Sequence, residues 1–307
     1  MCIRDRYYDP TTEDVIDYHQ GVEDLKHRVV RMIGDPRTRY REDPVRMLRA
    51  VRFAVKLNGN IDPASEEPLQ SMAGLIENVP ASRLFDEMLK LLTCGHAMDC
   101  LQRLRQDGLH QGMLPLLDVV LEQPSGAAFI ELALDRTDHR VRAGKTVSPS
   151  FLFAALLWHQ VELRWQQLQK QGETGIPALM QAADSVLDEQ TEKLAIQKRF
   201  SADMREIWFM QPRFDRRLPK SIWRMIEQPR FRAAVDFLQL RAAAGDFDSV
   251  LAQWWMDLAN ADDSGKADMI EELNNLPRES AAGAPRARRR RRSPRTVTGQ
   301  QDAPFVE

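Results

Sequence analysis

The sequence predicts a mainly α protein, and three observations support this fold class. Apolar residues recur at helical spacing through most of the chain after residue 26. Glycine and proline separate these runs, as at Gly34-Asp35-Pro36 and Gly59-Asn60. Hydrophobic residues make up 43% of the chain and charged residues 29%, which is ordinary for a soluble globular protein. At 307 residues the chain exceeds the usual domain size, so two or three packed units are expected.

Only the first 26 residues have an extended pattern. Residues 7–18, "YYDPTTEDVIDY", place aromatic and β-branched residues on either side of an Asp9-Pro10-Thr11-Thr12 turn, which predicts a β-hairpin. Because two strands alone are marginally stable, we expect this hairpin to be the remnant of a sheet that the chain does not contain. The first six residues, "MCIRDR", add no cap and no leading element, and we expect them to be foreign to the fold.

Helix start signals precede three of the later segments. They are Asp62-Pro63 before "ASEEPLQSMAGLI", Pro80 before "ASRLFDEMLKLL" and Ser148-Pro149 before "SFLFAALLW". In the second segment Leu84, Met88 and Leu91 share one face, while Glu87 and the other charged residues occupy the remaining faces. Further helices are predicted over residues 231–244 and 249–260. The six tryptophans recur at apolar helical positions, where burial is the usual outcome.

The C-terminal segment differs from the rest of the chain in charge and composition. From Pro277 onward large apolar residues almost disappear, so residues 278–307 are predicted to be disordered. Seven arginines fall within ten residues there, namely Arg286, Arg288, Arg289, Arg290, Arg291, Arg292 and Arg295. A flexible polycation binds phosphate backbones by counterion release without reading sequence, which indicates RNA binding. The alternatives are a solubilising tail or a tail that contacts an acidic protein.

The sequence has no clear pattern for a zinc or redox site, a membrane span or a metal-binding aspartate pair. Cys2, Cys94 and Cys100 match no common zinc or redox spacing, which favours free thiols in a reducing cytosol. No apolar run approaches the ~18 residues that a membrane span requires. The segment Gly245-Asp246-Phe247-Asp248 resembles a metal-binding aspartate pair, but it lies between two predicted helices. It is better interpreted as a helix end followed by an aspartate cap.

The stretch "YREDPVRMLRAVRF" (40–53) permits two interpretations. Asp43 and Pro44 form a good helix start, in which Asp43 caps its own helix and the arginines face solvent. Alternatively, Asp43 and Arg46 lie one turn apart on one side of the helix, and Arg49 continues the row. A carboxylate accepts from an exocyclic amine and a guanidinium donates in a planar fork, so a rigid pair can recognise a nucleobase edge. Spacing alone favours the cap, and Arg52 is expected at the surface.

A family resemblance reverses that preference for Asp43 and Arg46. Residues 31–57, "RMIGDPRTRYREDPVRMLRAVRFAVKL", are similar to the neck of bacterial poly(A) polymerases and tRNA nucleotidyltransferases, the class II nucleotidyltransferase family. "DYHQGVEDL" (17–25) resembles the family's hinge, and "VPASRLFDEMLKLL" (79–92) resembles the next helix. The C-terminal half, from "FLFAALLWHQVE" to the arginine-rich end, resembles the arm of the gammaproteobacterial poly(A) polymerases.

The resemblance assigns roles to individual residues. It implies that Asp43 and Arg46 hydrogen bond the incoming base. Glu42 would orient Arg46, while Arg49 and Arg83 would support the nucleotide pocket. The hinge residues that it implies are Asp17, Gly21 and Asp24. Four parts are expected: a head remnant and hinge (1–26), a helical neck and body (27–147), a helical arm (148–277) and the basic tail (278–307).

The function implied is RNA 3′-end polyadenylation, the template-independent transfer of AMP from ATP to RNA 3′-hydroxyls. The complete enzyme would use Mg²⁺ and ATP in a head domain. This chain would supply base recognition and RNA binding without metal ligands, and we expect it to be inactive alone. We further expect a cytoplasmic monomer that binds RNA and no membrane. Two alternatives stay open: a fragment of a tRNA CCA-adding enzyme, and a non-catalytic helical RNA-binding module. The arginine-rich end favours the polymerase over the CCA-adding enzyme. The signature at 42–53 argues against the non-catalytic module.

Overall fold

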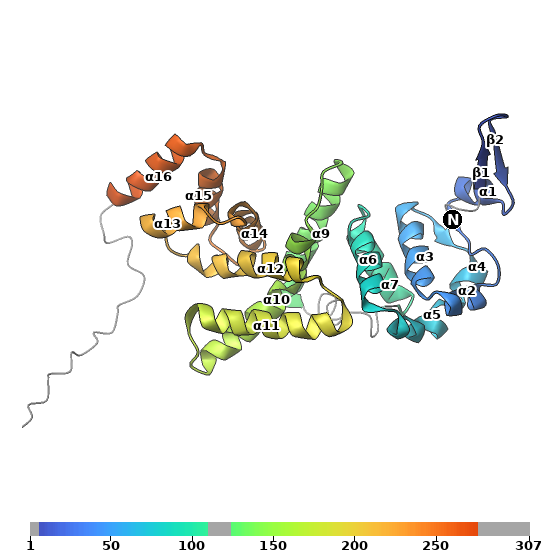
Figure 1. Ribbon diagram of the computed structural model, residues 1–307, viewed down its shortest axis with the longest axis horizontal. Coiled ribbons are helices and arrows are strands. Elements are labelled where there is room, and N and C mark those ends of the chain that lie inside the picture. Colours follow the sequence, from blue (N-terminus) through green and yellow to red (C-terminus); the bar gives the residue numbers. More distant parts are fainter. Residues whose placement is uncertain (1–5, 110–123, 276–307) are drawn as a thin grey trace, which may run out of the picture.

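A computed structural model describes residues 6–109 and 124–275, and helices dominate both segments. The chain runs along an elongated molecule, from a hairpin at one end to α16 at the other (Figure 1). The first segment contains β1 (Arg6–Asp9), β2 (Asp14–Asp17), α1 (Gly21–Lys26), β3 (Val29–Val30), α2 (Pro36–Glu42), α3 (Val45–Lys56), β4 (Asn60–Ile61), α4 (Pro63–Glu66), α5 (Pro68–Met72), the 3₁₀ helix η1 (Ala73–Asn78), α6 (Ala81–Leu92) and α7 (Ala97–Gln106).

The second segment is built only from helices. They are α9 (Pro124–Arg142), α10 (Pro149–Lys170), α11 (Gly175–Lys193), α12 (Lys198–Met210), the 3₁₀ helix η2 (Gln211–Arg213), α13 (Pro219–Ile226), α14 (Phe231–Ala243), α15 (Ser249–Asn260) and α16 (Asp263–Asn275). None of the helices in the two described segments is long and apolar enough to cross a membrane. The mainly α class predicted from the sequence is confirmed.

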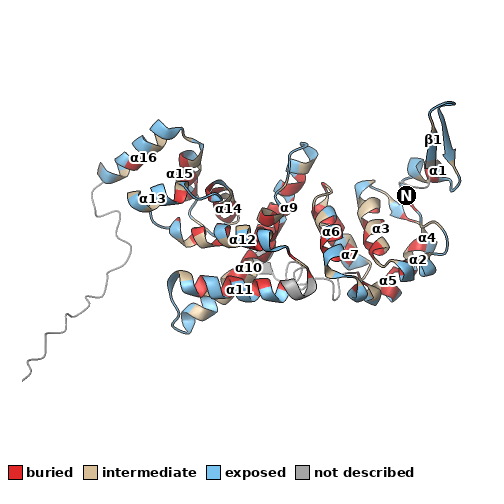
Figure 2. Cartoon of the chain, viewed as in Figure 1, coloured by how far each residue is buried: buried red, intermediate tan, exposed pale blue. Residues whose placement is uncertain are grey.

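The N-terminal hairpin forms as predicted. β1 pairs antiparallel with β2, from Arg6 opposite Asp17 to Asp9 opposite Asp14. Its apolar side chains are largely in contact with solvent: Tyr7 and Tyr8 are each 62% exposed and Val15 is 55% exposed. Figure 2 shows the strands in the colour of exposed residues, in contrast to the buried inner faces of the helices.

A short parallel pairing that the sequence did not predict joins β3 to β4. Val29 lies opposite Asn60 and Val30 opposite Ile61. The approach of the two segments is close, because a side chain at Gly59 would place its Cβ 1.9 Å from the backbone oxygen of Arg28. Only glycine fits there. This pairing ties the segment after α1 to the end of α3.

Two clusters of buried side chains form the core. The larger one runs from Val30 to Leu240 and includes Trp158 and Phe237. It therefore contains side chains from both sides of the expected boundary at 147/148. The smaller cluster, around Trp255, joins α13, α14, α15 and α16. Burial of apolar surface on this scale is the main force that holds helices of this kind together.

Several helix boundaries agree with the sequence signals. The segment after Asp62-Pro63 does not, because it forms α4, α5 and η1 in place of one predicted helix. Helices α6 and α15 have the predicted bounds, and α14 ends one residue early. Ser148 caps α10 by accepting from the backbone N–H of Phe151. Asp248 likewise caps α15 by accepting from the N–H of Leu251 at 2.6 Å, which confirms that this aspartate begins a helix.

One tryptophan contradicts the prediction of burial. Trp158, Trp208 and Trp255 are fully buried, but Trp223 on α13 is 42% exposed. Its neighbours Ile222 and Met225 occupy the buried face of the short helix, so Trp223 is left on the outer face. The arginine-rich tail and the first five residues lie outside the described part of the chain.

Candidate nucleotide-binding site

Asp43 joins α2 to α3 in an extended conformation, with φ −150° and ψ 92°. This conformation is the one expected directly before Pro44. Its backbone N–H ends α2 by donating to the carbonyl of Arg39 at 3.2 Å. Its carboxylate does not cap α3. Both oxygens instead accept from Nη2 of Arg83 on α6, at 3.0 and 3.1 Å. The cap interpretation of this carboxylate is therefore wrong.

Arg46 is held from the side of α2. Its Nη1 donates to Oε2 of Glu42 at 2.9 Å and to the backbone oxygen of Arg39 at 3.0 Å. The same Glu42 oxygen accepts from Nη1 of Arg39 at 2.7 Å. The hydrogen bond from Arg46, together with the charges of both arginines, lowers the pKa of Glu42. Glu42 is thus ionised and fixes one edge of the Arg46 guanidinium.

Asp43 and Arg46 retain hydrogen-bonding capacity after these contacts. Within the described segments, Nε and Nη2 of Arg46 have no hydrogen-bond partner. The Asp43 carboxylate accepts from a single guanidinium nitrogen, although a carboxylate has about four lone-pair sites. The backbone N–H of Arg46 donates to the carbonyl of Asp43 at 3.0 Å, so the two residues lie on one helical turn. Their side chains are 15% and 24% exposed, respectively.

The next two arginines of the row have a different environment. Arg49 donates to Glu87 at 3.2 Å, and Arg52 donates to the same carboxylate at 2.8 and 3.1 Å. The Glu87 side chain is only 2% exposed. A carboxylate buried this deeply requires cationic partners, because an unpaired charge away from water is very costly.

This ion cluster corrects two expectations from the sequence. Arg52, expected at the surface, has a side chain that is 14% exposed and is bound to Glu87. Glu87, assigned to a charged outer face of α6, is buried against α3. The sequence signal for this ion cluster was the repeat of arginines at intervals of three, because arginines on one side of a helix can share an acceptor on a neighbouring helix.

Helix α6 positions the polar side of α3 through two residues one turn apart. Arg83 binds Asp43, and Glu87 binds Arg49 and Arg52. The spacing of four residues places both side chains on the same side of α6. This helix therefore anchors both the candidate base-binding turn and the arginine row that follows it.

The residues expected to form a hinge make well-defined contacts around α1. Asp17 caps α1 by accepting from the backbone N–H groups of Gly21 at 2.9 Å and Val22 at 2.7 Å. Asp24 accepts from Nε and Nη2 of Arg31 at 3.0 and 3.1 Å. The remaining guanidinium nitrogen of Arg31, Nη1, donates to Oδ1 of Asp62 at 2.6 Å. Helix α1 is thereby linked both to the hairpin and to the segment before α4.

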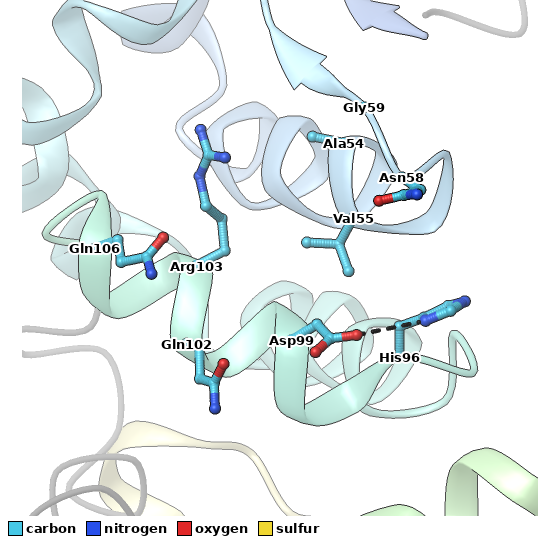
Figure 3. A pocket seen from close by; sticks show the side chains of 9 residues that line it. All are labelled: Ala54, Val55, Asn58, Gly59, His96, Asp99, Gln102, Arg103 and Gln106. Atoms are coloured by element: carbon cyan, nitrogen blue, oxygen red, sulfur yellow. Dashed lines mark ion pairs between the residues drawn. The ribbon is translucent and has the colours of Figure 1, made fainter.

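The chain also contains a cavity of about 420 Å³ that none of the expected site residues lines. Figure 3 shows it between the end of α3 and helix α7, with Val55 on one side and Asp99 and Gln102 on the other. It lies at the opposite end of α3 from Arg46, roughly 15 Å away at 1.5 Å per helical residue. Two of its lining residues contact each other: Nδ1 of His96 is 3.5 Å from Oδ2 of Asp99.

Mg²⁺ was expected in the head domain of the complete enzyme, and the described residues supply no cluster of metal ligands for it. In residues 6–109 and 124–275 no three His, Cys, Asp or Glu side chains gather in a way that could hold a metal ion. Asp43 and Asp24 are each bound to arginines instead. The residues of this site do not fit a Mg²⁺ centre, and none of its chemistry is assigned to one.

Known proteins resemble the chain over most of its length. Family models match residues 171–296 ("Polymerase A arginine-rich C-terminus") and residues 60–121 ("Probable RNA and SrmB-binding site of polymerase A"). Poly(A) polymerase I of Salmonella typhi is 41% identical over 304 residues, which cover 96% of this chain and 64% of the relative. This chain belongs to the bacterial poly(A) polymerase family. The chain spans 64% of the length of this relative, slightly less than two thirds.

Two other proteins are similar to the chain, one over a shorter stretch and one at lower identity. The CCA-adding enzyme of Levilactobacillus brevis is 44% identical over 97 residues, which are 32% of this chain and 24% of that enzyme. A solved structure of a tRNA-processing enzyme with CTP superimposes with a TM-score of 0.54. It covers 90% of this chain and 72% of its own at 18% identity. This last likeness establishes the shared fold.

Proposed function

We propose that this poly(A) polymerase chain supplies base recognition and RNA binding to an enzyme that adds AMP from ATP to RNA 3′ ends. One observation supports the proposal: Asp43 and Arg46 are fixed by separate partners on one turn, and both keep hydrogen-bonding capacity that no described residue uses. Fixed partners reduce the entropy lost when a base binds. The similarity to poly(A) polymerases over nearly the whole chain supports adenylate transfer.

The pair complements the Watson–Crick edge of adenine. The exocyclic amine of adenine donates to the Asp43 carboxylate, and its neighbouring ring nitrogen accepts from the Arg46 guanidinium. Guanine and uracil present a carbonyl oxygen where adenine has the amine, so that oxygen would meet the Asp43 carboxylate without a proton between them. Cytosine has the same amine and ring nitrogen as adenine. The pair therefore selects amino bases from oxo bases, and the size of the pocket must distinguish ATP from CTP.

A surface on the arm has the composition expected for binding single-stranded RNA. Lys220, Trp223 and Arg224 are exposed on α13 at spacings of three and four residues, so they share one face. Neither cation forms an ion pair in the part of the chain that the structure describes. An exposed aromatic ring stacks on bases of any sequence, and adjacent cations neutralise phosphates. Sequence-independent binding suits an enzyme that repeatedly extends one strand.

This surface lies within the matched arginine-rich region, residues 171–296. The arginines from Arg286 to Arg295 follow it in sequence and would extend the same electrostatic attraction. We infer that α13 and the tail together hold the RNA, whereas the neck selects the nucleotide.

The proposal is tested by a chimera in which this chain follows the part of the Salmonella typhi enzyme that it does not match. We expect Mg²⁺-dependent AMP addition to an RNA primer, with ATP used in preference to GTP and UTP. Asp43→Asn should lower ATP use roughly tenfold to a hundredfold, because hydrogen bonds to charged groups contribute about 1.5–3 kcal/mol.

Asp86→Asn is the matched control, because Asp86 is an exposed acid on α6 with no ion pair among the described residues. Equal nucleotide preference in the two variants would refute base recognition by Asp43. Addition that stops after a CCA end on tRNA would instead assign the chain to the CCA-adding branch.

A further inference from the structure

Two cysteines that the nucleotide site does not use lie next to each other. Cys94 follows α6 in the turn before α7, and Cys100 lies within α7. Their sulfur atoms are 3.5 Å apart, and both thiols are free. Cys100 is fully buried, whereas Cys94 is partly exposed. A small reagent can therefore reach Cys94 but not Cys100.

The two thiols have different acidities. The hydrogen bond from Cys100 lowers the pKa of Cys94 to about 7, with burial opposing it and the backbone N–H of His96 assisting. The same hydrogen bond and burial raise the pKa of Cys100. Cys94 also precedes the N-terminus of α7, where the helix dipole favours an anion. The pair thus combines an accessible thiolate with a buried thiol in contact with it.

We infer that Cys94 and Cys100 are a site of oxidative modification, which hydroperoxides convert to an intrachain disulfide. The Cys94 thiolate attacks the terminal peroxide oxygen, so that an S–O bond forms, the O–O bond breaks, and the leaving oxygen takes up a proton. The sulfur of Cys100 then attacks that of Cys94. An S–S bond forms, and the hydroxyl leaves as water with the Cys100 proton. The two thiols lose two electrons, and the peroxide gains them.

The two sulfur atoms begin close to bonding distance. The sulfur atoms must approach from 3.5 Å to a bond length of roughly 2.05 Å. Gly95, next to Cys94, has φ +89°, a conformation that suits a tight turn between two helices. The disulfide would fix this turn at the end of α6, the helix that carries Arg83 and Glu87. The inference does not depend on the proposed function, because it rests only on the two thiols and their surroundings.

The full chain provides an internal control for the test. Trypsin releases residues 91–103, which contain both cysteines, and residues 1–4, which contain Cys2. After hydrogen peroxide and iodoacetamide, we expect the first peptide to carry no alkyl group, to have lost two hydrogen atoms, and to recover both thiols in dithiothreitol. Its oxidation should be roughly fivefold faster than that of Cys2 at pH 7, given the larger thiolate fraction.

Two variants separate the steps. In Cys100→Ser, whose hydroxyl can still donate to the Cys94 thiolate but cannot form a disulfide, the sulfenic acid at Cys94 should persist and react with dimedone. In Cys94→Ala the buried Cys100 should resist peroxide. Alkylation of both cysteines in the wild-type peptide, after peroxide treatment that has oxidised Cys2, would overturn the inference. A disulfide between Cys2 and either residue would overturn it as well. The wild-type readout does not depend on the variants folding.

Discussion

The two halves of α3 carry the same residue type in different surroundings. Arg49 and Arg52 bind Glu87, which is buried between α3 and α6. Arg46, one turn earlier, is bound along one edge only and keeps two nitrogen groups free in the described structure. Arg49 also keeps unpartnered guanidinium nitrogens among the described residues, so the number of hydrogen bonds does not separate the two halves. The acceptor does: Arg49 and Arg52 share a buried carboxylate on α6, whereas Arg46 is held by the exposed Glu42 and a backbone oxygen of α2. The following predictions test this contrast, from the largest effect to the smallest.

The strongest prediction concerns Glu87. Glu87→Gln removes the buried negative charge and leaves three cations, Arg49, Arg52 and Lys90, around a neutral amide. Breaking a buried pair costs about 3–5 kcal/mol, but Arg49 is 41% exposed and can turn toward water. We therefore expect the free energy of unfolding to fall by about 2–3 kcal/mol in urea titrations. Asp86→Asn, one residue away, should change it by less than about 0.5 kcal/mol. Equal stabilities of the two variants would show that the Glu87 charge does not stabilise the fold.

Arg83 provides the next test, because it holds Asp43, the residue proposed to contact the base. Its side chain is 51% exposed, so Arg83→Gln should cost less than about 1 kcal/mol of stability. In the chimera it should nevertheless reduce the preference for ATP over GTP about fivefold, since a misplaced Asp43 loses its geometry toward the base. Arg83→Lys should restore part of this preference. A loss of overall rate with unchanged base preference would contradict a positioning role.

A smaller effect is expected for RNA binding by α13. Trp223→Ala should weaken binding of an unstructured RNA by about 1–2 kcal/mol, and Lys220→Gln should reduce the salt slope by roughly one unit. Lys170→Gln, an exposed lysine at the end of α10 without a described ion pair, is the control. Because the arginine tail can mask the loss, binding is measured both in the full chain and after deletion of 286–295. No change in either background would exclude α13 from the RNA surface.

The sequence was sufficient where structure depends on local patterns. Periodicity and start signals gave the bounds of α6 and α15, and alternation gave the hairpin. It was insufficient where contacts join distant segments. The buried Glu87 is paired with arginines that lie 38 and 35 positions earlier, whereas the sequence of α6 alone shows only an acid beside other charges. Trp223 is exposed because its short helix packs through Ile222 and Met225, which periodicity over eight residues could not decide.

The candidate site was predictable only in part. The resemblance identified Asp43, Arg46, Glu42 and Arg83, and the structure brings these residues together at the junction of α2, α3 and α6. The pairing of Asp43 with Arg83 could not be read from spacing, because they are 40 residues apart. The local capping signal at Asp43-Pro44 pointed to another partner. A long-range ion pair therefore overrides the local preference of the carboxylate.

The most direct measurement removes the group that Asp43 is proposed to contact. The chimera is given either ATP or purine riboside triphosphate, which lacks the exocyclic amine, and the rate of addition to RNA is compared. The account predicts that the wild-type sequence prefers ATP roughly tenfold or more, and that Asp43→Asn reduces this preference to within about threefold. If the wild type uses both nucleotides equally, or if Asp43→Asn keeps the full preference, Asp43 does not recognise the base.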